Sequence, residues 1–267
     1  MMKIGFIGLG NMGGSLARLV AQDERFRSEL LLANRSRDKA EKIAAEVGGQ
    51  PVSNAEVFAQ AEVIFLGIKP AQFADLLADY REILEKRDSL LLVSMAAGLT
   101  LEILEKLTPS HHRWIRIMPN TPVAVGEGVI SYDLSQKAYQ ADEDLFRELL
   151  SSAGILVKLD EKQLDAATAL AGCGPAFVYL FIEALADAGV RAGLSRDISL
   201  QLANQTLLGA AKLSQISGQH PAQLKDQVCS PAGSTIAGVA SLEENVFRGT
   251  VMAAVQAAYK RTQELGK

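Results

Sequence analysis

A glycine-rich segment near the amino terminus is the first candidate for chemistry. Gly8, Gly10 and Gly13 have the spacing GxGxxG, directly after the apolar run 3–7 and directly before a helical pattern over 16–20. In a strand–turn–helix unit the first glycine permits a tight turn, the second lets a ligand approach the backbone, and the third lets the helix pack on the strand. The helix amino terminus then faces an anion. This setting predicts a pyrophosphate site, in preference to a glycine turn that merely joins two elements.

The end of the next predicted strand, 30–33, indicates which dinucleotide binds. A site for NAD usually has an acidic residue here, which accepts hydrogen bonds from the ribose 2′-hydroxyl. This sequence has Asn34-Arg35-Ser36-Arg37 instead. A guanidinium offers a rigid fork of donors that suits a 2′-phosphate. We therefore expect NADP(H) as the cofactor, and a solvated basic turn is the alternative.

A second candidate site lies in the carboxy-terminal part of the chain. Proline, glycine and hydroxyl residues gather over 229–236, which reads Cys-Ser-Pro-Ala-Gly-Ser-Thr-Ile. Amide N–H groups and hydroxyls at a helix start can form a pocket for an anion. A plain N-cap with proline at the first helical position explains the same residues. The local sequence favours neither interpretation.

The elements that position these residues follow from apolar runs. Continuous apolar runs over 63–68 and 90–94, and a weaker one over 114–118, are typical of strands covered on both faces. They alternate with helical patterns such as 36–47, which Gly48 and Gly49 end. This alternation predicts an α/β fold with a parallel, doubly wound sheet of the Rossmann type. Ligands bind beyond the carboxyl ends of such strands, which directs attention to 69–70, 96–98 and 119–122.

The pattern changes after the run 154–158, because residues from 161 onward show only helical periodicity. We therefore expect an NADP-binding domain over 1–159 and an all-helical domain over 160–267, with a final helix from about residue 243. The helix after Pro175 is apolar on both sides, and a domain of this size cannot cover it alone. A second subunit is the expected cover. The uncharged run 166–182 is interrupted by Gly172, Gly174 and Pro175, so we expect no membrane span.

Composition excludes several other classes of function. The chain has 267 residues, of which 48% are hydrophobic and 22% are charged, as in an ordinary soluble protein of two domains. A net charge of −4 argues against a nucleic-acid partner. Two cysteines without CxxC spacing, and no secretory segment ahead of the first strand, favour a reducing cytoplasm. His111, His112 and His220 lack metal-ligand spacing, so we expect no metal site and interpret them as structural or solvated.

Together these segments resemble the pyrroline-5-carboxylate reductase family. The resemblance covers both predicted domains and rests on GFIGLGNMG at 5–13, Asn34-Arg35, GIKP at 67–70, MPNTP at 118–122, GCGPA at 172–176 and SPAGST at 230–235. The last segment is the most diagnostic. The family reduces the cyclic imine 1-pyrroline-5-carboxylate to L-proline, the last step of proline biosynthesis. The resemblance thus implies that reaction with NADP(H), with NAD(H) at lower affinity, and a homodimer or a larger ring paired through the helical domain.

The resemblance also implies roles for single residues. It places the pyrophosphate on Gly8, Leu9, Gly10, Asn11 and Met12, and the adenosine half near Asn34, Arg35 and Asn54. It places Ile68, Lys69 and Pro70, and Met95, Ala96 and Ala97, beside the nicotinamide half. It implies that Ser230, Gly233, Ser234 and Thr235 hold the substrate, with backbone amides on its carboxylate and the Thr235 hydroxyl near the ring nitrogen. The family usually has glycine where Ala232 stands, so a positive φ at this position would strain the loop.

The reaction requires little from side chains. A protonated imine is already electrophilic, so the enzyme must chiefly align its carbon with the nicotinamide and exclude water. Thr235 is the candidate catalytic residue, orienting or relaying the nitrogen proton, and Lys69 is the alternative. A β-hydroxyacid dehydrogenase would need a lysine soon after its central glycines, but none follows Gly174 until Lys212. A non-catalytic NADP-binding sensor remains the alternative from another class.

Overall fold

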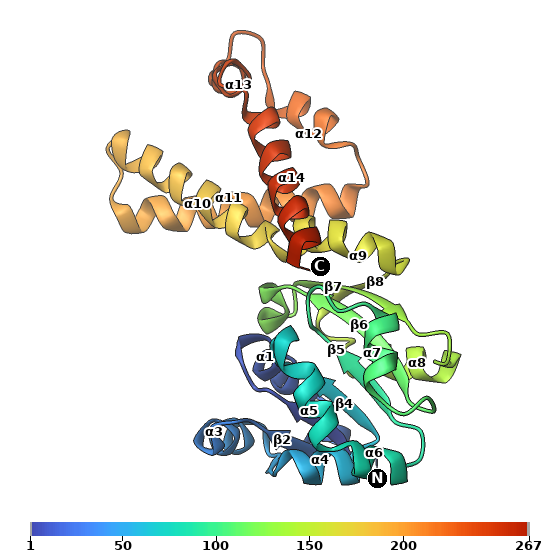
Figure 1. The fold of residues 1–267 in the computed structure, drawn as a ribbon. Helices are drawn as coiled ribbons and strands as arrows, with labels where there is room; N and C mark the ends of the chain where they lie inside the picture. The colour runs from blue at the N-terminus through green and yellow to red at the C-terminus, as the bar shows by residue number, and fades with distance from the viewer. Residues whose placement is uncertain (1, 266–267) are drawn as a thin grey trace. The chain divides into compact units, whose positions relative to one another are not determined.

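The computed structural model describes residues 2–265, which form two compact units (Figure 1). The first unit comprises the described residues up to Cys173 and those from Ala258 onward. The second unit is Gly174–Ala257.

The first unit is built on one 8-stranded sheet with the strand order β3-β2-β1-β4-β5-β6-β7-β8. The strands are β1 (Ile4–Ile7), β2 (Leu30–Ala33), β3 (Gln50–Pro51), β4 (Val63–Leu66), β5 (Leu91–Ser94), β6 (Arg113–Pro119), β7 (Gly128–Leu134) and β8 (Gly154–Lys158). The α-helices are α1 (Asn11–Val20), α2 (Glu24–Arg27), α3 (Arg37–Val47), α4 (Asn54–Gln60), α5 (Phe73–Asp79), α6 (Arg81–Lys86), α7 (Leu101–Leu107), α8 (Gln140–Leu149) and α9 (Glu161–Ala167). Three further turns of helix are η1 (Pro70–Gln72), η2 (Thr121–Val125) and η3 (Thr168–Gly172).

The sheet confirms the predicted fold class with one correction. All neighbouring strands are parallel except β6 and β7, which run antiparallel. The apolar runs had predicted a wholly parallel sheet without β7. Parallel strands need a crossover of a dozen or more residues, whereas only the short segment containing η2 joins β6 to β7. The shortness of this connection explains the antiparallel pairing.

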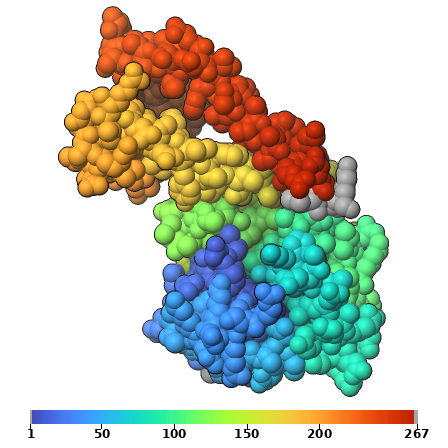
Figure 2. Space-filling model, turned by 60° about the vertical axis from the view of Figure 1, so that its left-hand side comes forward, coloured from blue at the N-terminus to red at the C-terminus, as the bar shows by residue number. Residues whose placement is uncertain are grey.

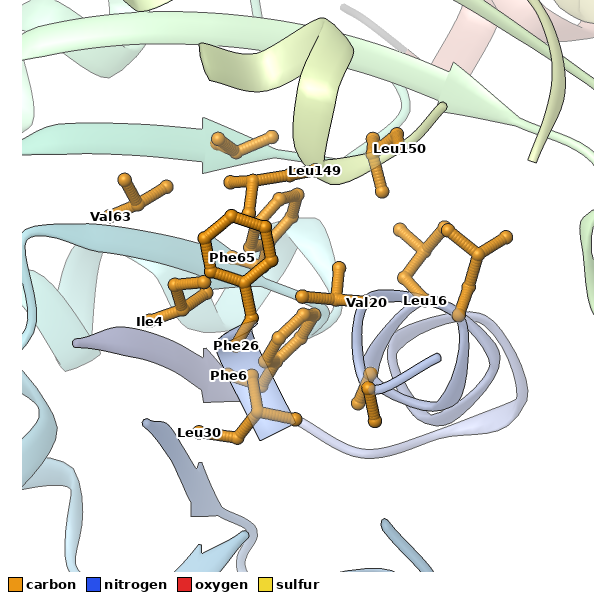
Figure 3. Close-up of a cluster of buried hydrophobic side chains, with 14 of the residues drawn as sticks. Ile4, Phe6, Leu16, Val20, Phe26, Leu30, Val63, Phe65, Leu149 and Leu150 are labelled. Carbon is orange, nitrogen blue, oxygen red and sulfur yellow. The ribbon is translucent and has the colours of Figure 1, made fainter. Parts of the chain in front are cut away.

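Two apolar cores lie on the two faces of the sheet, because successive side chains of a strand point to opposite faces. Phe6 and Phe65, on neighbouring strands, stack in one core with ring centroids 4.7 Å apart (Figure 3). Ile7 and Leu66, the next residues along the same strands, lie in the other core. Burial on both faces is what the continuous apolar runs predicted.

A buried histidine connects two elements of the second core. The backbone N–H of Leu90 donates to His112 Nδ1 at 3.1 Å, so the proton of the neutral ring lies on Nε2, which is 3.1 Å from the Leu84 carbonyl oxygen. Burial, and then the neighbouring His111, lower the pKa of His112 from 6.5 to about 4. His112 is therefore structural, which is one of the two roles that the sequence predicted for the histidines.

We expect this histidine to make the fold sensitive to acid. Because the folded state favours the neutral ring, the contribution of His112 to the free energy of unfolding is fully present above pH 6.5. It is lost as the pH falls toward about 4. The loss is about 3 kcal/mol at most. Urea unfolding of the wild type and of His112→Leu between pH 4 and 7 measures it. The variant should be less stable at pH 7, but its free energy of unfolding should fall less steeply between pH 7 and pH 4 than that of the wild type. Equal pH dependence in the two proteins would contradict this role of His112.

The second unit is entirely helical and has almost no interior of its own. It contains α10 (Gly174–Arg191), α11 (Arg196–Ser217), α12 (Pro221–Val228), α13 (Ser234–Glu244) and most of α14 (Phe247–Leu265). Within 174–257 the buried residues are Ala186, Ser199 and Ala203. Large apolar side chains of this unit, including Leu180, Leu202, Leu208 and Leu213, are exposed. The unit is coloured gold to orange-red in Figure 2. The final helix begins later than predicted, because Val246 has a φ of 58° and separates α13 from α14.

The division into units differs from the predicted boundary between residues 159 and 160. The helices α9 and η3 belong to the first unit, which ends at Cys173. Ion pairs explain part of this, because Arg116 of β6 contacts Glu161 at 3.1 Å and Asp165 at 3.3 Å. The helical stretch Glu161–Arg191 is long and apolar enough to span a membrane by length and composition. One such stretch is weak evidence, so the absence of a membrane span stays a prediction.

Candidate active site

The three glycines of the GxGxxG segment have three different surroundings. Gly8 has a φ of 89°, and a Cβ atom there would lie 2.6 Å from the Gly67 carbonyl oxygen. A Cβ atom on Gly13 would lie 2.1 Å from the Gly8 carbonyl oxygen. A Cβ atom on Gly10 would have no neighbouring atom within 4 Å. The first and third glycines therefore let the turn and the helix close up, while the second leaves open space where a ligand can reach the backbone.

The start of α1 has the electrostatics of an anion site. Gly10 is the N-cap, so no side chain caps the helix, and the first turn has no acidic residue. The first amides of a helix have no partner within it and carry the positive end of its dipole. A pyrophosphate fits both the open space at Gly10 and these donors. The residues present therefore fit a dinucleotide cofactor.

Asn34 connects this loop to the end of β2. Its Oδ1 accepts a hydrogen bond from Leu9 N at 3.0 Å, and its Nδ2 donates to the Ser36 carbonyl oxygen at 3.1 Å. Its side-chain amide is therefore used to hold the protein's own backbone. The Leu9 side chain lies in the core, so Leu9 can face a cofactor only through its backbone. The roles of Asn34 and Leu9 in cofactor binding stay predictions, and the structure supports positioning of the loop.

The turn after β2 presents basic and hydroxyl groups to solvent. Arg35 is exposed and makes no ion pair among residues 2–265, whereas Arg37 is paired with Glu41 at 2.9 Å. Ser36 is the N-cap of α3, but its hydroxyl makes no capping bond. These features suit a phosphate next to Arg35. No role was predicted for Ser36 itself, although a serine directly before a helix is a recognisable signal of an N-cap.

The remaining predicted cofactor residues come from neighbouring strands. Since β1, β4 and β5 are adjacent and parallel, Gly8, Ile68 and Ala97 follow their carboxyl ends at one edge of the sheet. The strand order reverses between β1 and β4, which is where open α/β sheets bind ligands. Lys69 and Pro70 are exposed beside this point.

Two of the predicted residues have less access than expected. Ala96 is only 2% exposed and lies in the second core, so its side chain cannot contact a cofactor. Asn54 is the first residue of α4 and is half-buried. The cofactor roles of Ala96 and Asn54 stay predictions.

The predicted substrate residues lie in the second unit, between α12 and α13. Gly233 N donates to the Ser230 carbonyl oxygen at 3.0 Å, which closes a turn ahead of the helix. Gly233 is the N-cap of α13, and Ser234 and Thr235 are its first two residues. The simple alternative, with proline at the first helical position, is wrong because Pro231 lies before the N-cap. No side chain caps α13, so its first amides are free for an anion.

Comparisons with known proteins cover this whole chain. Residues 161–265 match the family described as pyrroline-5-carboxylate reductase dimerisation, and residues 3–98 match that described as NADP oxidoreductase coenzyme F420-dependent. The chain is 45% identical to a pyrroline-5-carboxylate reductase of Pisum sativum, over 98% of this chain and 95% of that one. It belongs to the pyrroline-5-carboxylate reductase family.

Solved structures of pyrroline-5-carboxylate reductases agree with this. A Plasmodium falciparum pyrroline carboxylate reductase crystallised with NADP bound has a TM-score of 0.87 and 36% identity, and the match covers 100% of this chain and 98% of that one. A pyrroline-5-carboxylate reductase of Coxiella burnetii has a TM-score of 0.90 and 30% identity, with 100% and 99% covered.

In this reductase the loop before α13 is strained at Ala232. Its φ is 58°, the left-handed region that favours glycine. A positive φ was expected to strain an alanine at this position, and this condition is met. The cost is about 1–2 kcal/mol. The loop therefore keeps its left-handed residue although alanine replaces the usual glycine.

The reductase thus brings its predicted cofactor residues together in the first unit and its predicted substrate residues together in the second. Thr235, the candidate catalytic residue, is the second residue of α13 and is partly buried. The groups available are open backbone amides in both units, one exposed arginine and hydroxyls. Such a set can bind anions and orient a reactant, which suits transfer between a bound dinucleotide and a small acid.

Proposed function

We propose that this protein reduces 1-pyrroline-5-carboxylate to L-proline with NADPH, the last step of proline biosynthesis. The observation that carries this proposal is similarity to pyrroline-5-carboxylate reductases along the whole chain, which includes both the glycine loop and the loop before α13. The open space at Gly10 supports a dinucleotide as the hydride source.

The protein's part in the reaction is binding, orientation and exclusion of water. When bound, NADPH supplies the hydride from its nicotinamide ring. The loop at Gly8–Met12 holds the pyrophosphate, and the first amides of α13 hold the substrate carboxylate. Thr235 then contacts the ring nitrogen of the imine and keeps its proton in place. No paired carboxylates or Ser-His-Asp set is required, because the protonated imine is already electrophilic.

A substrate panel tests this function directly. Oxidation of NADPH, followed by its absorbance, should proceed with 1-pyrroline-5-carboxylate and yield proline. Oxidation of 3-hydroxyisobutyrate with reduction of NADP should not proceed. Activity on the hydroxy acid alone would indicate a β-hydroxyacid dehydrogenase, and binding of NADPH without turnover of either substrate would indicate a sensor.

Thr235→Ala should lower kcat more than it weakens NADPH binding. The hydroxyl orients the reacting nitrogen, and general acid–base groups of this kind contribute about 10²-fold or more to rate. Steady-state kinetics with the imine, together with a fluorescence titration of NADPH, separate the two effects. Thr235→Ser, which keeps the hydroxyl, is the matched control and should retain most of the rate. An unchanged kcat in Thr235→Ala would leave this residue only a helix-forming role.

Arg35→Ala should weaken NADPH far more than NADH. The guanidinium is exposed and free of an internal ion pair among the described residues, so a 2′-phosphate would lose a charge-assisted partner worth about 1.5–3 kcal/mol. Arg37→Ala is the control, because Arg37 already pairs with Glu41. Dissociation constants for both cofactors measure the difference. Equal losses for NADPH and NADH would remove Arg35 from this role.

The proposal extends to cofactor preference, assembly and location. We infer NADH as a second cofactor of lower affinity, since its ribose lacks the phosphate that Arg35 would bind. We infer a homodimer, either alone or as the unit of a larger ring. The second unit exposes large apolar side chains and matches a family named for dimerisation. The free Cys173 and Cys229 are compatible with the cytoplasm as its location.

A further inference from the structure

The side-chain amide of Asn120 connects two segments of the first unit. Asn120 follows β6 and is 7% exposed. Its Oδ1 accepts from Val129 N of β7 at 2.8 Å, and its Nδ2 donates to the carbonyl oxygen of Ala171 in η3 at 3.0 Å. A backbone N–H can face only the oxygen of the amide, so the contact with Val129 fixes the amide orientation. The donor end is thereby directed to Ala171.

The Ala171 carbonyl lies where α-helical hydrogen bonding is interrupted. In an α-helix this carbonyl would accept from the N–H of residue 175. Residue 175 is a proline, which has no N–H and whose ring crowds the carbonyl four residues before it. The chain forms the π-helical turn η3 instead, with Cys173 N donating to the Thr168 carbonyl oxygen at 2.9 Å. Asn120 thus supplies a donor to a carbonyl that Pro175 cannot serve.

The turn η3 lies at the end of the first compact unit. Directly after η3, between Cys173 and Gly174, the chain passes from the first compact unit into the second. The predicted cofactor residues lie before this point and the loop 229–236 lies after it. Single π-turns inside helices occur frequently at functional sites.

We propose that Asn120 is a positioning residue, which fixes η3 beside the carboxyl end of β6, at the edge of the sheet where the parallel strands β1, β4 and β5 also end. The inference rests on the proposed function, because its effect on turnover is measured with that reaction. Asn120 acts only through η3 and contacts no reacting group. Its loss should therefore affect turnover while NADPH binding is kept.

The test is a double-mutant cycle of Asn120→Ala and Pro175→Ala. Asn120→Ala should lower kcat by about tenfold, as expected for one lost buried hydrogen bond expressed in the transition state, with an unchanged Kd for NADPH. Pro175→Ala restores an N–H four residues after Ala171 and should have little effect alone. In the Asn120→Ala background it should recover most of the lost kcat. A residue that only stabilised the fold would show its loss and its rescue in the melting temperature, with kcat unchanged.

Ser135→Ala is the matched control. Ser135 is also buried, and its Oγ accepts from Trp114 N at 3.0 Å near the other end of β6, far along the strand from η3. It should lower the melting temperature without lowering kcat. Equal kcat in Asn120→Ala and Ser135→Ala would overturn the proposal, and so would a further loss when Pro175→Ala is added to Asn120→Ala.

Two further measurements keep the test decisive. If Asn120→Ala does not fold, Asn120→Asp retains the acceptor for Val129 and replaces the donor to Ala171 with a carboxylate oxygen, which repels the carbonyl, and a rescue by Pro175→Ala in the same direction is expected. If the wild type does not reduce the imine, the proposed function fails first. Amide hydrogen exchange over 168–176 then still tests the positioning role, because Asn120→Ala should speed exchange there and Pro175→Ala should slow it again. Unchanged exchange would overturn the proposal.

Discussion

Replacing Gly10 with valine should abolish NADPH binding and leave the fold intact. Gly10 has a φ of −62° and a ψ of −168°, a conformation open to any residue, and a Cβ there meets no atom within 4 Å. The added side chain would instead fill the space through which a pyrophosphate reaches the first amides of α1. Losing those contacts should weaken NADPH by roughly 100-fold or more, since each charge-assisted hydrogen bond contributes about 1.5–3 kcal/mol.

Gly13→Ala should give the opposite result. Its Cβ would lie 2.1 Å from the Gly8 carbonyl oxygen, which is backbone and cannot move aside easily. The variant should lose several kcal/mol of stability, since overpacking that forces the backbone to shift costs about 1–3 kcal/mol or more. Thermal unfolding and NADPH titration of both variants measure the contrast. Tight NADPH binding by a folded Gly10→Val protein would place the pyrophosphate elsewhere.

Leu180→Asp should abolish both self-association and turnover while NADPH still binds. Leu180 lies on α10 and is 66% exposed, next to Tyr179, which is 59% exposed. A second unit with so few buried residues needs cover from another subunit, and each buried leucine side chain contributes about 1.5–3 kcal/mol. A two-fold interface contains the substituted residue twice, so the loss of association free energy is doubled. Two carboxylates would also have to be buried. Micromolar protein should sediment as a monomer.

Ile103→Asp is the control for this substitution. Ile103 is also an exposed aliphatic residue on a helix, 38% exposed, but it lies on α7 of the first unit. It should leave the sedimentation and the turnover of the wild type unchanged. Sedimentation velocity and the imine assay decide the matter. A Leu180→Asp protein that remains a dimer with full turnover would contradict the proposed interface.

The sequence by itself determined the elements whose pattern is local. Continuous apolar runs predicted β1, β2, β4, β5 and β6, because a strand covered on both faces needs apolar residues at every position. The setting of GxGxxG between a strand and a helix predicted three roles for three glycines, and the space around Gly8, Gly10 and Gly13 agrees with each. The helix after Pro175 was predicted to lack full cover within its own domain, and α10 leaves Val178, Tyr179 and Leu180 exposed.

Tertiary structure decided what depends on partners distant in the sequence. Asn34 was predicted beside the cofactor, but its amide is used by Leu9 and Ser36, and no local pattern shows that competition. Ala96, two residues after β5, is buried among the side chains of the second core. The antiparallel β7 depends on a short connection, and the extent of the first unit depends on contacts of Arg116 and Asn120 with helices about fifty residues away. Hydrogen bonds and ion pairs of this kind join residues by geometry, so they become visible only once the chain is folded.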